Sequence, residues 1–483
     1  MKVTVIDCSV SGHRETYYKQ FAQTWAGMGH ETSLIAPDGK GVQETVAFQP
    51  VSALPLLPLP AGKPLQKKLV VLRNAVIRLR NLYRLRRSLQ RLNPDLVFFA
   101  CLDDMLPTLA PLWLFNLLLP YQWSGLLVQS ALPPYHRGMP DTRPFLRSKN
   151  CVGVGILNEY SAKDLKTFQY HILLFPDFAD LSAPATNYPL LQKLKEKAKG
   201  RKVISLLGSI NFRKGIKLLL ESIPLLPKDE YFFLIAGKSS LTAQQENDLR
   251  AFGESRNNCL FSLEKIPDES CFNALIAESD LIFAAYKQFT GSSNLLTKAA
   301  AFRKPVIVSR GLCMGRRVEQ YGTGQTTGED NAGECSAAIR SLCTETRMDI
   351  QAFARYAHEH EVEKLITCFN QISKHIRRNP PLPECHAQQA TGKRSRNNRC
   401  QSKEREYDHR QRGENGRRRN LQASDYTGEE DVLRKKRFPR PSRNHCGRKT
   451  GYSGSRMALL PASILPARTE KGYEVLQRQA GDS

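Results

Sequence analysis

The chain twice starts a series of short apolar runs that alternate with helical segments. Residues 2–7 form the first run, a turn of small residues and a helical pattern follow, and residues 32–36 form the next run. The same order begins again with apolar runs at residues 203–207 and 231–236. A strand, a tight turn, a helix and another strand are typical of a parallel sheet with helical crossovers. The sequence therefore predicts an α/β fold with two such sheets, and we expect their further strands at residues 95–100, 125–129, 153–157, 172–175, 279–285 and 306–308.

A turn of small residues stands between the last two of these strands. It consists of Gly291, Ser292, Ser293 and Asn294, and it leads into a short Ala-rich helix. Ser and Asn side chains cap helix starts, and the free amides and dipole of a helix start favour an anion. An ordinary capped helix is the alternative, but the strands on both sides are typical of a nucleotide-binding sheet. We therefore expect these four residues to bind phosphate.

The frame of this region resembles that of the large retaining glycosyltransferase family with two Rossmann-like domains facing a cleft, the GT-B fold. The resemblance covers about residues 1–377 and is strongest over residues 203–324. The family carries two Glu residues in its donor motif, and these positions hold Thr290 and Lys298 here. The resemblance implies a nucleotide-sugar donor, transfer with retention of configuration, and no cofactor. Because both carboxylates are missing, a degenerate scaffold that binds a nucleotide or a sugar is the alternative.

The turn after residues 203–207 matches the part of this family that holds the donor diphosphate. Gly208 and Ser209 end the strand and are expected to contact the nucleotide, and Arg213 and Lys214 precede the next helix. Lys214 matches the family's Lys, whereas Ser209 replaces its Arg, so Arg213 is expected to supply that charge. Both cations are expected to be catalytic, because charge builds up on the bridging oxygen as the sugar bond breaks. The alternative for both is a solvated helix start.

The acceptor is expected at the carboxyl ends of the N-terminal strands, where ligands of parallel sheets bind. Gly12 and His13 follow the first strand and Gln129 ends another, so these residues are expected on the acceptor side. A Gly turn is equally compatible with packing alone. The resemblance implies a cell-envelope glycan or a lipid-linked acceptor. Asp103 and Asp104 are the nearest match to a metal-binding Asp pair, but they are expected to form a turn, and we expect no metal site.

These assignments predict an acceptor domain over residues 1–178, a donor domain over residues 200–348 and a closing helix over residues 349–377 that returns to the N-terminal domain. Residues 379–483 change character, because they carry 23 Lys and Arg against 12 Asp and Glu with almost no apolar periodicity. A disordered basic tail and out-of-frame translation both fit that composition. The charge of the tail leaves nucleic-acid binding as an alternative function, which we consider the weaker one.

A second basic segment spans residues 63–93, which hold ten Lys or Arg, no acidic residue, and apolar residues at helical spacing. Such a helix can lie on an anionic membrane. A domain helix with a charged outer face is the alternative, and the near absence of aromatic residues argues against nucleic acid. The apolar stretch at residues 106–119 is shorter than a membrane span and is expected to form a buried helix or loop. The twelve cysteines show no metal-binding spacing, which favours reduced thiols. We therefore expect a cytoplasmic protein that can lie peripherally on the inner face of the membrane.

Overall fold

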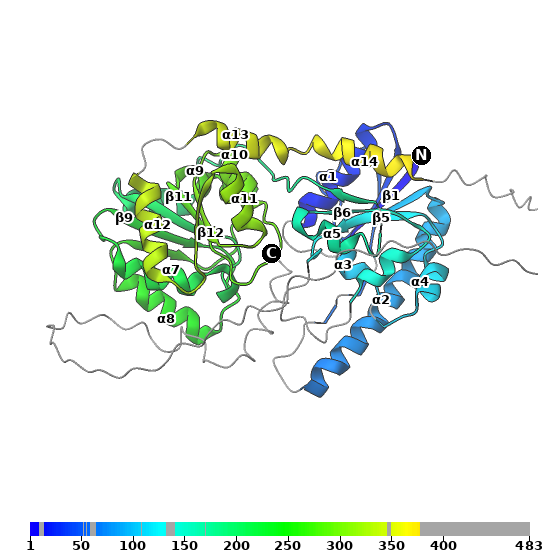
Figure 1. Ribbon diagram of the computed structural model, residues 1–483, viewed down its shortest axis with the longest axis horizontal. Helices are drawn as coiled ribbons and strands as arrows, with labels where there is room; N and C mark the ends of the chain where they lie inside the picture. Colours follow the sequence, from blue (N-terminus) through cyan, green and yellow to red (C-terminus); the bar gives the residue numbers. More distant parts are fainter. Residues whose placement is uncertain are drawn as a thin grey trace, which may run out of the picture. The chain divides into compact units, whose positions relative to one another are not determined.

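The computed structural model describes residues 1–376 except for 9–13, 52, 55, 58–63, 108, 132–140, 170 and 345–348. The described residues belong to one compact unit that contains two parallel sheets (Figure 1). The prediction of two Rossmann-like sheets in an α/β fold is therefore confirmed. The strands of the two sheets fall within the expected domain ranges, and the domain boundaries themselves stay a prediction. Gly12, His13 and residues 379–483 lie outside the described residues.

The N-terminal sheet has seven strands in the order β3-β2-β1-β4-β5-β6-β7, and every neighbouring pair is parallel. The apolar strands of this sheet were expected. Strand β3 was not expected, because it lies at an edge of the sheet and most of its side chains are exposed. The strands are β1 (Lys2–Ile6), β2 (Glu31–Ala36), β3 (Val46–Pro50), β4 (Leu96–Phe99), β5 (Trp123–Leu127), β6 (Cys151–Ile156) and β7 (Ile172–Leu174).

The C-terminal sheet has six strands in the order β10-β9-β8-β11-β12-β13, again with parallel neighbours. The two edge strands, β10 and β13, were missed because they are short and partly polar. A turn at Gly322, which has a φ of 70°, leads from α11 into β13. The strands are β8 (Lys202–Leu207), β9 (Tyr231–Ala236), β10 (Cys259–Ser262), β11 (Leu281–Ala284), β12 (Val306–Ser309) and β13 (Gly324–Thr327).

Helices cover both faces of each sheet, as parallel strands require. In the N-terminal sheet, α1 (Arg14–Gly27) and α14 (Lys364–Lys374) pack on one face, and α2 (Pro64–Leu92) and α4 (Leu112–Leu118) pack on the other. In the C-terminal sheet one face carries α6 (Pro189–Ala198), α9 (Glu269–Glu278), α10 (Leu295–Ala301), α11 (Cys313–Tyr321) and α13 (Ile350–Glu359). The other carries α7 (Ile216–Ser222), α8 (Ala243–Glu254) and α12 (Ala332–Thr344).

Several short helices lie in the connections between these elements. They are α3 (Leu102–Met105), α5 (Ala162–Leu165) and the 3-10 helices η2 (Arg143–Arg147), η3 (Glu159–Ser161), η4 (Phe212–Lys214) and η5 (Ile223–Leu225). No helix among the described residues is long and apolar enough to cross a bilayer. The stretch at residues 106–119 is buried on one face only, since Phe115 is buried but Trp113 is 66% exposed.

The closing segment is two helices rather than the single helix expected over residues 349–377. The helical conformation is interrupted between α13 and α14, where the side chain of His360 is buried. The apolar faces of the two helices pack on different sheets. The expected return to the N-terminal part is confirmed by α14. Its Phe369 ring is fully buried and stacks on Trp25 of α1, with ring centroids 4.3 Å apart.

We expect Phe369→Ala to lower the free energy of unfolding by about 3–5 kcal/mol, because it removes a buried ring and leaves a cavity against Trp25. Urea unfolding followed by circular dichroism measures this. Ile366→Ala on the same helix is the matched control, since Ile366 is 43% exposed and should change stability by no more than about 0.5 kcal/mol. Equal losses in the two variants would contradict the packing described for α14.

Candidate functional site

The loops after β8 and β9 meet backbone to backbone at the carboxyl edge of the C-terminal sheet. Gly208 and Gly237 both have a positive φ, of 99° and 142°. A Cβ atom on Gly237 would lie 1.7 Å from the carbonyl oxygen of Gly208, so only glycine fits there. Ser209 follows in the same turn and is buried, with Asn211 donating to its Oγ at 3.3 Å. The edge of the sheet is therefore lined by backbone and by small side chains.

Gly215 brings the basic turn of η4 against the end of β11. It has a φ of 78°, and a Cβ atom there would lie 2.2 Å from the carbonyl oxygen of Ala285. Asn211 caps η4 by accepting from the amide of Lys214. This close approach lets the side chain of Lys214 reach Tyr286, the second residue after β11.

Lys214, which is half-buried, and Tyr286, which is buried, form a polar pair at this edge. The Lys214 ammonium donates to the Tyr286 hydroxyl at 2.8 Å and lies 4.1 Å from the centre of its ring, and Tyr286 is 3% exposed. Burial lowers the pKa of Lys214, although Tyr286 works against this shift. Burial alone would raise the pKa of Tyr286, but the Lys214 charge and hydrogen bonds with Lys214 and Ser293 lower it. The site thus holds a cation next to an acidified phenol.

Arg213 points to aromatic rings beside this pair. Its guanidinium lies 4.8 Å from the centre of the Phe289 ring and 5.8 Å from that of Tyr286. The backbone carbonyl of Arg213 accepts from the amide of Lys287 at 2.7 Å. The structure therefore brings Arg213 and Lys214 together with the loop after β11, and their predicted contact with the donor diphosphate stays a prediction.

The four residues of the predicted phosphate turn point in different directions. Ser293 bonds to Tyr286, whereas Ser292 donates to Asp177 and accepts from Arg317. Asn294 is buried at the start of α10, and among the described residues no side chain caps this helix, so the expected Ser or Asn cap is wrong. The backbone carbonyl of Asn294 instead accepts from the amide of Lys298 at 2.9 Å. Gly291 precedes them and stays half-buried.

The two positions that hold Glu in the resembled family make structural contacts here. The Thr290 hydroxyl donates to the carbonyl of Ala131 at 3.1 Å, and its own carbonyl accepts from Asn158 at 2.7 Å. Lys298 is 1% exposed, and its ammonium lies 2.7 Å from a carboxylate oxygen of Glu269. Lys298 also donates to the side chain of Asn273 and to the carbonyl of Asp180, both at 2.6 Å.

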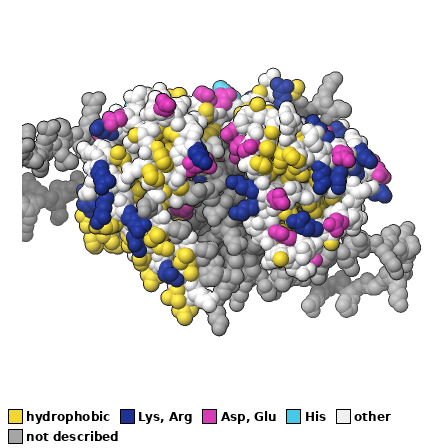
Figure 2. Space-filling model, turned by 180° about the vertical axis from the view of Figure 1, so that it is seen from behind, with side chains coloured by type: hydrophobic (Ala, Val, Ile, Leu, Met, Phe, Trp, Pro, Cys, Tyr) yellow, Lys and Arg dark blue, Asp and Glu magenta, His cyan; other side chains and the backbone are white. Residues whose placement is uncertain are grey.

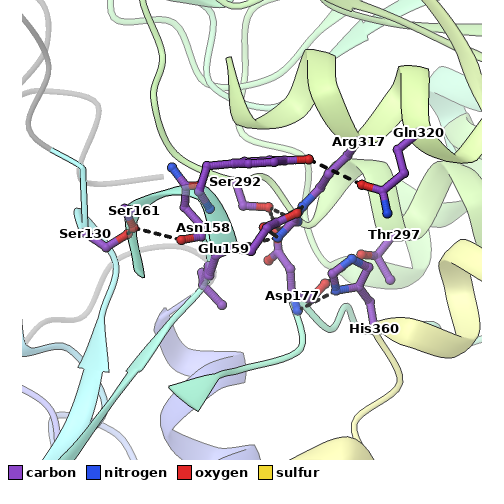
Figure 3. A network of polar contacts seen from close by, with 12 residues as sticks. Ser130, Asn158, Glu159, Ser161, Asp177, Ser292, Thr297, Arg317, Gln320 and His360 are labelled. Carbon is purple, nitrogen blue, oxygen red and sulfur yellow. Dashed lines mark hydrogen bonds and ion pairs between the residues drawn. The ribbon is translucent and has the colours of Figure 1, made fainter. Parts of the chain in front are cut away.

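A buried cation in α11 gathers polar groups from several distant segments (Figure 3). Arg317 is 1% exposed, and its guanidinium lies 2.7 Å from Glu159 and 3.8 Å from Asp177, two carboxylates that precede α6 in the chain. It also donates to Ser292 at 2.5 Å. Glu159 belongs to η3, which Asn158 caps by accepting from the amide of Tyr160 at 3.0 Å. Of the side chains that Arg317 contacts, only Ser292 was predicted as a site residue, and it was expected to bind phosphate rather than an arginine.

Asp177 receives hydrogen bonds on its carboxylate and on its backbone. Tyr17 donates to the carboxylate at 2.8 Å, and Thr297 donates to the carbonyl at 2.6 Å. The amide of Asp177 donates to Nδ1 of His360 at 3.0 Å. Burial, helped by the charge of Arg317, lowers the pKa of His360 to about 3, so this ring is neutral at physiological pH. Burial raises the pKa of Asp177, while Arg317 and the hydroxyl donors oppose that shift.

The N-terminal sheet carries a second polar group at its carboxyl edge. Asp103 accepts from the amides of Val128 and Gln129 at 2.8 and 3.1 Å, which places Gln129 just after β5, and its role toward an acceptor stays a prediction. Asp104 pairs with Arg14 of α1 at 2.5 Å. Both Asp residues belong to the short helix α3 rather than to a turn. Within the described part of the chain, no three His, Cys, Asp or Glu side chains gather as a metal site.

Removing the cation at the centre of the network should destabilise the protein. We expect Arg317→Leu to lower the free energy of unfolding by about 3–5 kcal/mol, because it leaves the buried carboxylate of Asp177 without its counter-ion. Arg316→Leu is the matched control, since Arg316 is exposed on the same helix and should stay within about 0.5 kcal/mol of the unchanged protein. Urea unfolding of both variants measures the difference, and a mild effect of Arg317→Leu would show that the network is dispensable.

Solved structures with the same arrangement of two sheets match most of the chain. WaaG, a glycosyltransferase involved in lipopolysaccharide biosynthesis, is 12% identical with a TM-score of 0.52 over 78% of this chain and 100% of its own. The structure described as trehalose-6-phosphate from E. coli, bound with UDP-2-fluoro glucose, is 12% identical with a TM-score of 0.58 over 78% and 99%. Anabaena Alr3699/HepE in complex with UDP is 14% identical with a TM-score of 0.56 over 77% and 100%.

The family comparison covers the part of the chain that holds the Lys214–Tyr286 pair. Residues 201–345 match the family described as glycosyl transferases group 1. No curated protein matches the sequence. The matched residues include all six strands of the C-terminal sheet, and the structural matches extend over both sheets. Residues 201–345 thus form a glycosyl transferases group 1 domain, and the chain is a glycosyltransferase with the GT-B fold.

Proposed function

We propose that this protein transfers a glycosyl group from a nucleoside diphosphate sugar to a cell-envelope glycan or lipid-linked acceptor, with retention of anomeric configuration. The observation that carries the proposal is the hydrogen-bonded Lys214–Tyr286 pair at the carboxyl edge of the C-terminal sheet. Ligands of parallel sheets bind at this edge. Proteins with the same fold hold UDP or UDP-2-fluoro glucose, which supports a nucleotide donor here as well.

The donor diphosphate is assigned to the loops after β8 and β11. Backbone amides near Gly208 and Gly291, the hydroxyl of Ser293 and the ammonium of Lys214 are donors that suit phosphate oxygens. In the reaction the bond between the anomeric carbon and the donor oxygen breaks, and the nucleoside diphosphate leaves with the bonding electrons. The acceptor hydroxyl oxygen forms the new bond, and its proton passes to the departing diphosphate oxygen. Lys214 would stabilise the negative charge that develops on the leaving oxygen.

The positions of Thr290 and Lys298 favour a second candidate function. Both side chains are engaged in contacts within the protein, so neither supplies the carboxylate of the resembled family. A scaffold that binds the nucleotide without transferring the sugar would keep the diphosphate site and lose turnover. Release of the nucleoside diphosphate from a panel of sugar nucleotides separates the two candidates, and NMR of the product's anomeric configuration tests retention. We propose a cytoplasmic location and no metal or other cofactor.

The diphosphate site can be tested by binding alone. We expect Lys214→Ala to weaken UDP binding by about 1.5–3 kcal/mol, the size of a charge-assisted hydrogen bond. Ser293→Asp should weaken it further, because it places a negative charge beside the phosphates. Lys217→Ala is the matched control, since Lys217 pairs with Glu221 on α7. Isothermal titration with UDP, and with other nucleoside diphosphates in parallel, measures all three, and unchanged affinity in both site variants would refute the assignment.

The lowered pKa of Lys214 predicts how binding depends on pH. Only the ammonium form attracts phosphate, so UDP affinity should fall as the pH rises through the lowered pKa, below the range of an ordinary lysine. Lys214→Arg should bind UDP with a flat profile over the same range, because the guanidinium stays charged. Tyr286→Phe controls for the phenol, whose ionisation would also repel phosphate. If UDP affinity depended on pH in the same way in the unchanged protein and in Lys214→Arg, the ammonium would be excluded as the titrating group.

A further inference from the structure

Helix α2 is much longer than the strands that it connects. It has 29 residues and is therefore about 43 Å long, whereas β3 and β4 have five and four residues and span only about 13–17 Å. Because it crosses between parallel strands, it starts at their carboxyl edge and runs back to their amino edge. Its Arg78 donates to the carbonyl of Asp103, just after β4, at 3.0 Å. The helical turns before Arg78 therefore extend beyond the carboxyl edge of the sheet (Figure 1).

The projecting part of α2 is held by the chain that precedes it. Asn74 exchanges two hydrogen bonds with the backbone of Leu57, at 2.8 and 2.9 Å. Asn81, two turns later, exchanges two bonds of 2.9 Å with the backbone of Leu54. Among the described side chains of α2, Asn74 is the first buried one. The helix is thus fixed in place where it leaves the sheet.

Helix α2 carries two apolar faces, and the core uses only one. Leu82, Leu85 and Leu89 are buried against the sheet. A second set recurs at intervals of four, three, four and seven residues, which places its members on one line along the opposite face of the helix. We call this set the α2 stripe: Leu65, Leu69, Leu72, Val76 and Tyr83, which are 69, 53, 54, 58 and 51% exposed.

Basic side chains border the α2 stripe. We call Arg73, Arg80, Arg87 and Arg91 the basic flank; all four are exposed, and their spacing places them along one side of the stripe. Lys68 is exposed on the other side. The helix contains no acidic residue. Figure 2 shows hydrophobic and basic side chains next to each other on this part of the surface.

Helix α4 adds an aromatic side chain to the same surface. It contacts α2, and Arg86 of α2 donates to the carbonyl of Leu117 at 2.9 Å. Trp113 and Leu117 of α4 are 66 and 54% exposed. An exposed indole on a helix that packs against the basic, leucine-rich α2 suits a lipid surface, because such rings sit at the headgroup level. A nucleic acid would find cations here but few aromatic rings on which to stack bases.

We propose that the α2 stripe, the basic flank and Trp113 dock this protein on an anionic lipid bilayer. The apolar stripe would enter the headgroup region while the arginines contact lipid phosphates. Because the projecting turns of α2 lie at the carboxyl edge of the N-terminal sheet, docking would bring the edge that holds Asp103 and Gln129 to the membrane surface. The proposed acceptor would then be lipid-linked, and this last step rests on the proposed glycosyl transfer.

Co-sedimentation with vesicles tests the docking surface without any donor or acceptor. We expect the protein to bind vesicles of phosphatidylcholine mixed with phosphatidylglycerol, and to bind phosphatidylcholine vesicles poorly. Replacing Arg73, Arg80 and Arg91 together by Gln should lower the partition coefficient about 100-fold, given about fivefold for each basic residue. Leu69→Ser with Leu72→Ser should lower it at least about tenfold, because two exposed leucines no longer enter the bilayer.

Matched controls separate this surface from general charge or apolarity. Lys193, Lys197 and Lys228 are exposed on the C-terminal part, and replacing all three by Gln removes the same charge. Leu181 is 51% exposed and lies outside α2, so Leu181→Ser matches the leucine variants. These controls should keep full vesicle binding. UDP titration of every variant should stay unchanged, so that a failure of docking is distinguished from a failure of the donor site.

Three outcomes would overturn the proposal. Equal binding to both kinds of vesicle, or no binding to either, would exclude an electrostatic dock. An equal loss in the lysine control would show that only net charge matters. A change of oligomeric state in sedimentation velocity when Leu69 and Leu72 are replaced, with vesicle binding intact, would assign the α2 stripe to a second copy of this chain.

Discussion

The described structure depends on one buried guanidinium. A cation that is removed from water must be paired, because its desolvation costs several kcal/mol. Arg317 meets this requirement with Glu159, Asp177 and Ser292, which belong to three separate segments. The planar group donates in several directions at once, so it fixes these segments relative to α11. Ser292 belongs to the proposed donor turn, and the ion network therefore positions that turn through its own hydroxyl. The neutral ring of His360 completes the arrangement without adding a second buried charge.

Much of the fold follows from apolar runs, because a strand with neighbours on both sides and helices on both faces must be apolar throughout. β9 and β11 are entirely buried and were predicted. The strands β3, β10 and β13 lie at sheet edges and bury fewer side chains. Their apolar pattern was therefore too weak to predict a strand. The break between α13 and α14 was missed for the opposite reason: apolar periodicity continues across it, and only the packing on two different sheets reveals it.

The site was predictable where its residues are neighbours in sequence. Lys214 was recognised from the turn around it, whereas its partner Tyr286 lies 72 residues away. A usable signal existed, because Tyr286 directly follows an apolar strand whose carboxyl end faces ligands. Arg317 and Glu159 are 158 residues apart, and neither segment carries a sequence pattern that predicts a contact with the other. Tertiary packing determines such pairs, and they cannot be predicted from the pattern of a single sequence.

The environment of Lys298 constrains how this chain could change. Its ammonium forms an ion pair with the carboxylate of Glu269 and donates hydrogen bonds to the side-chain oxygen of Asn273 and the carbonyl of Asp180. A carboxylate at this position would meet Glu269 as a like charge and would leave the oxygens of Asn273 and Asp180 without this donor. Restoring the family's Glu by a single substitution would therefore be costly, and α9 would have to change first. A carboxylate at position 298 would therefore need a second substitution at Glu269 before it could be accommodated.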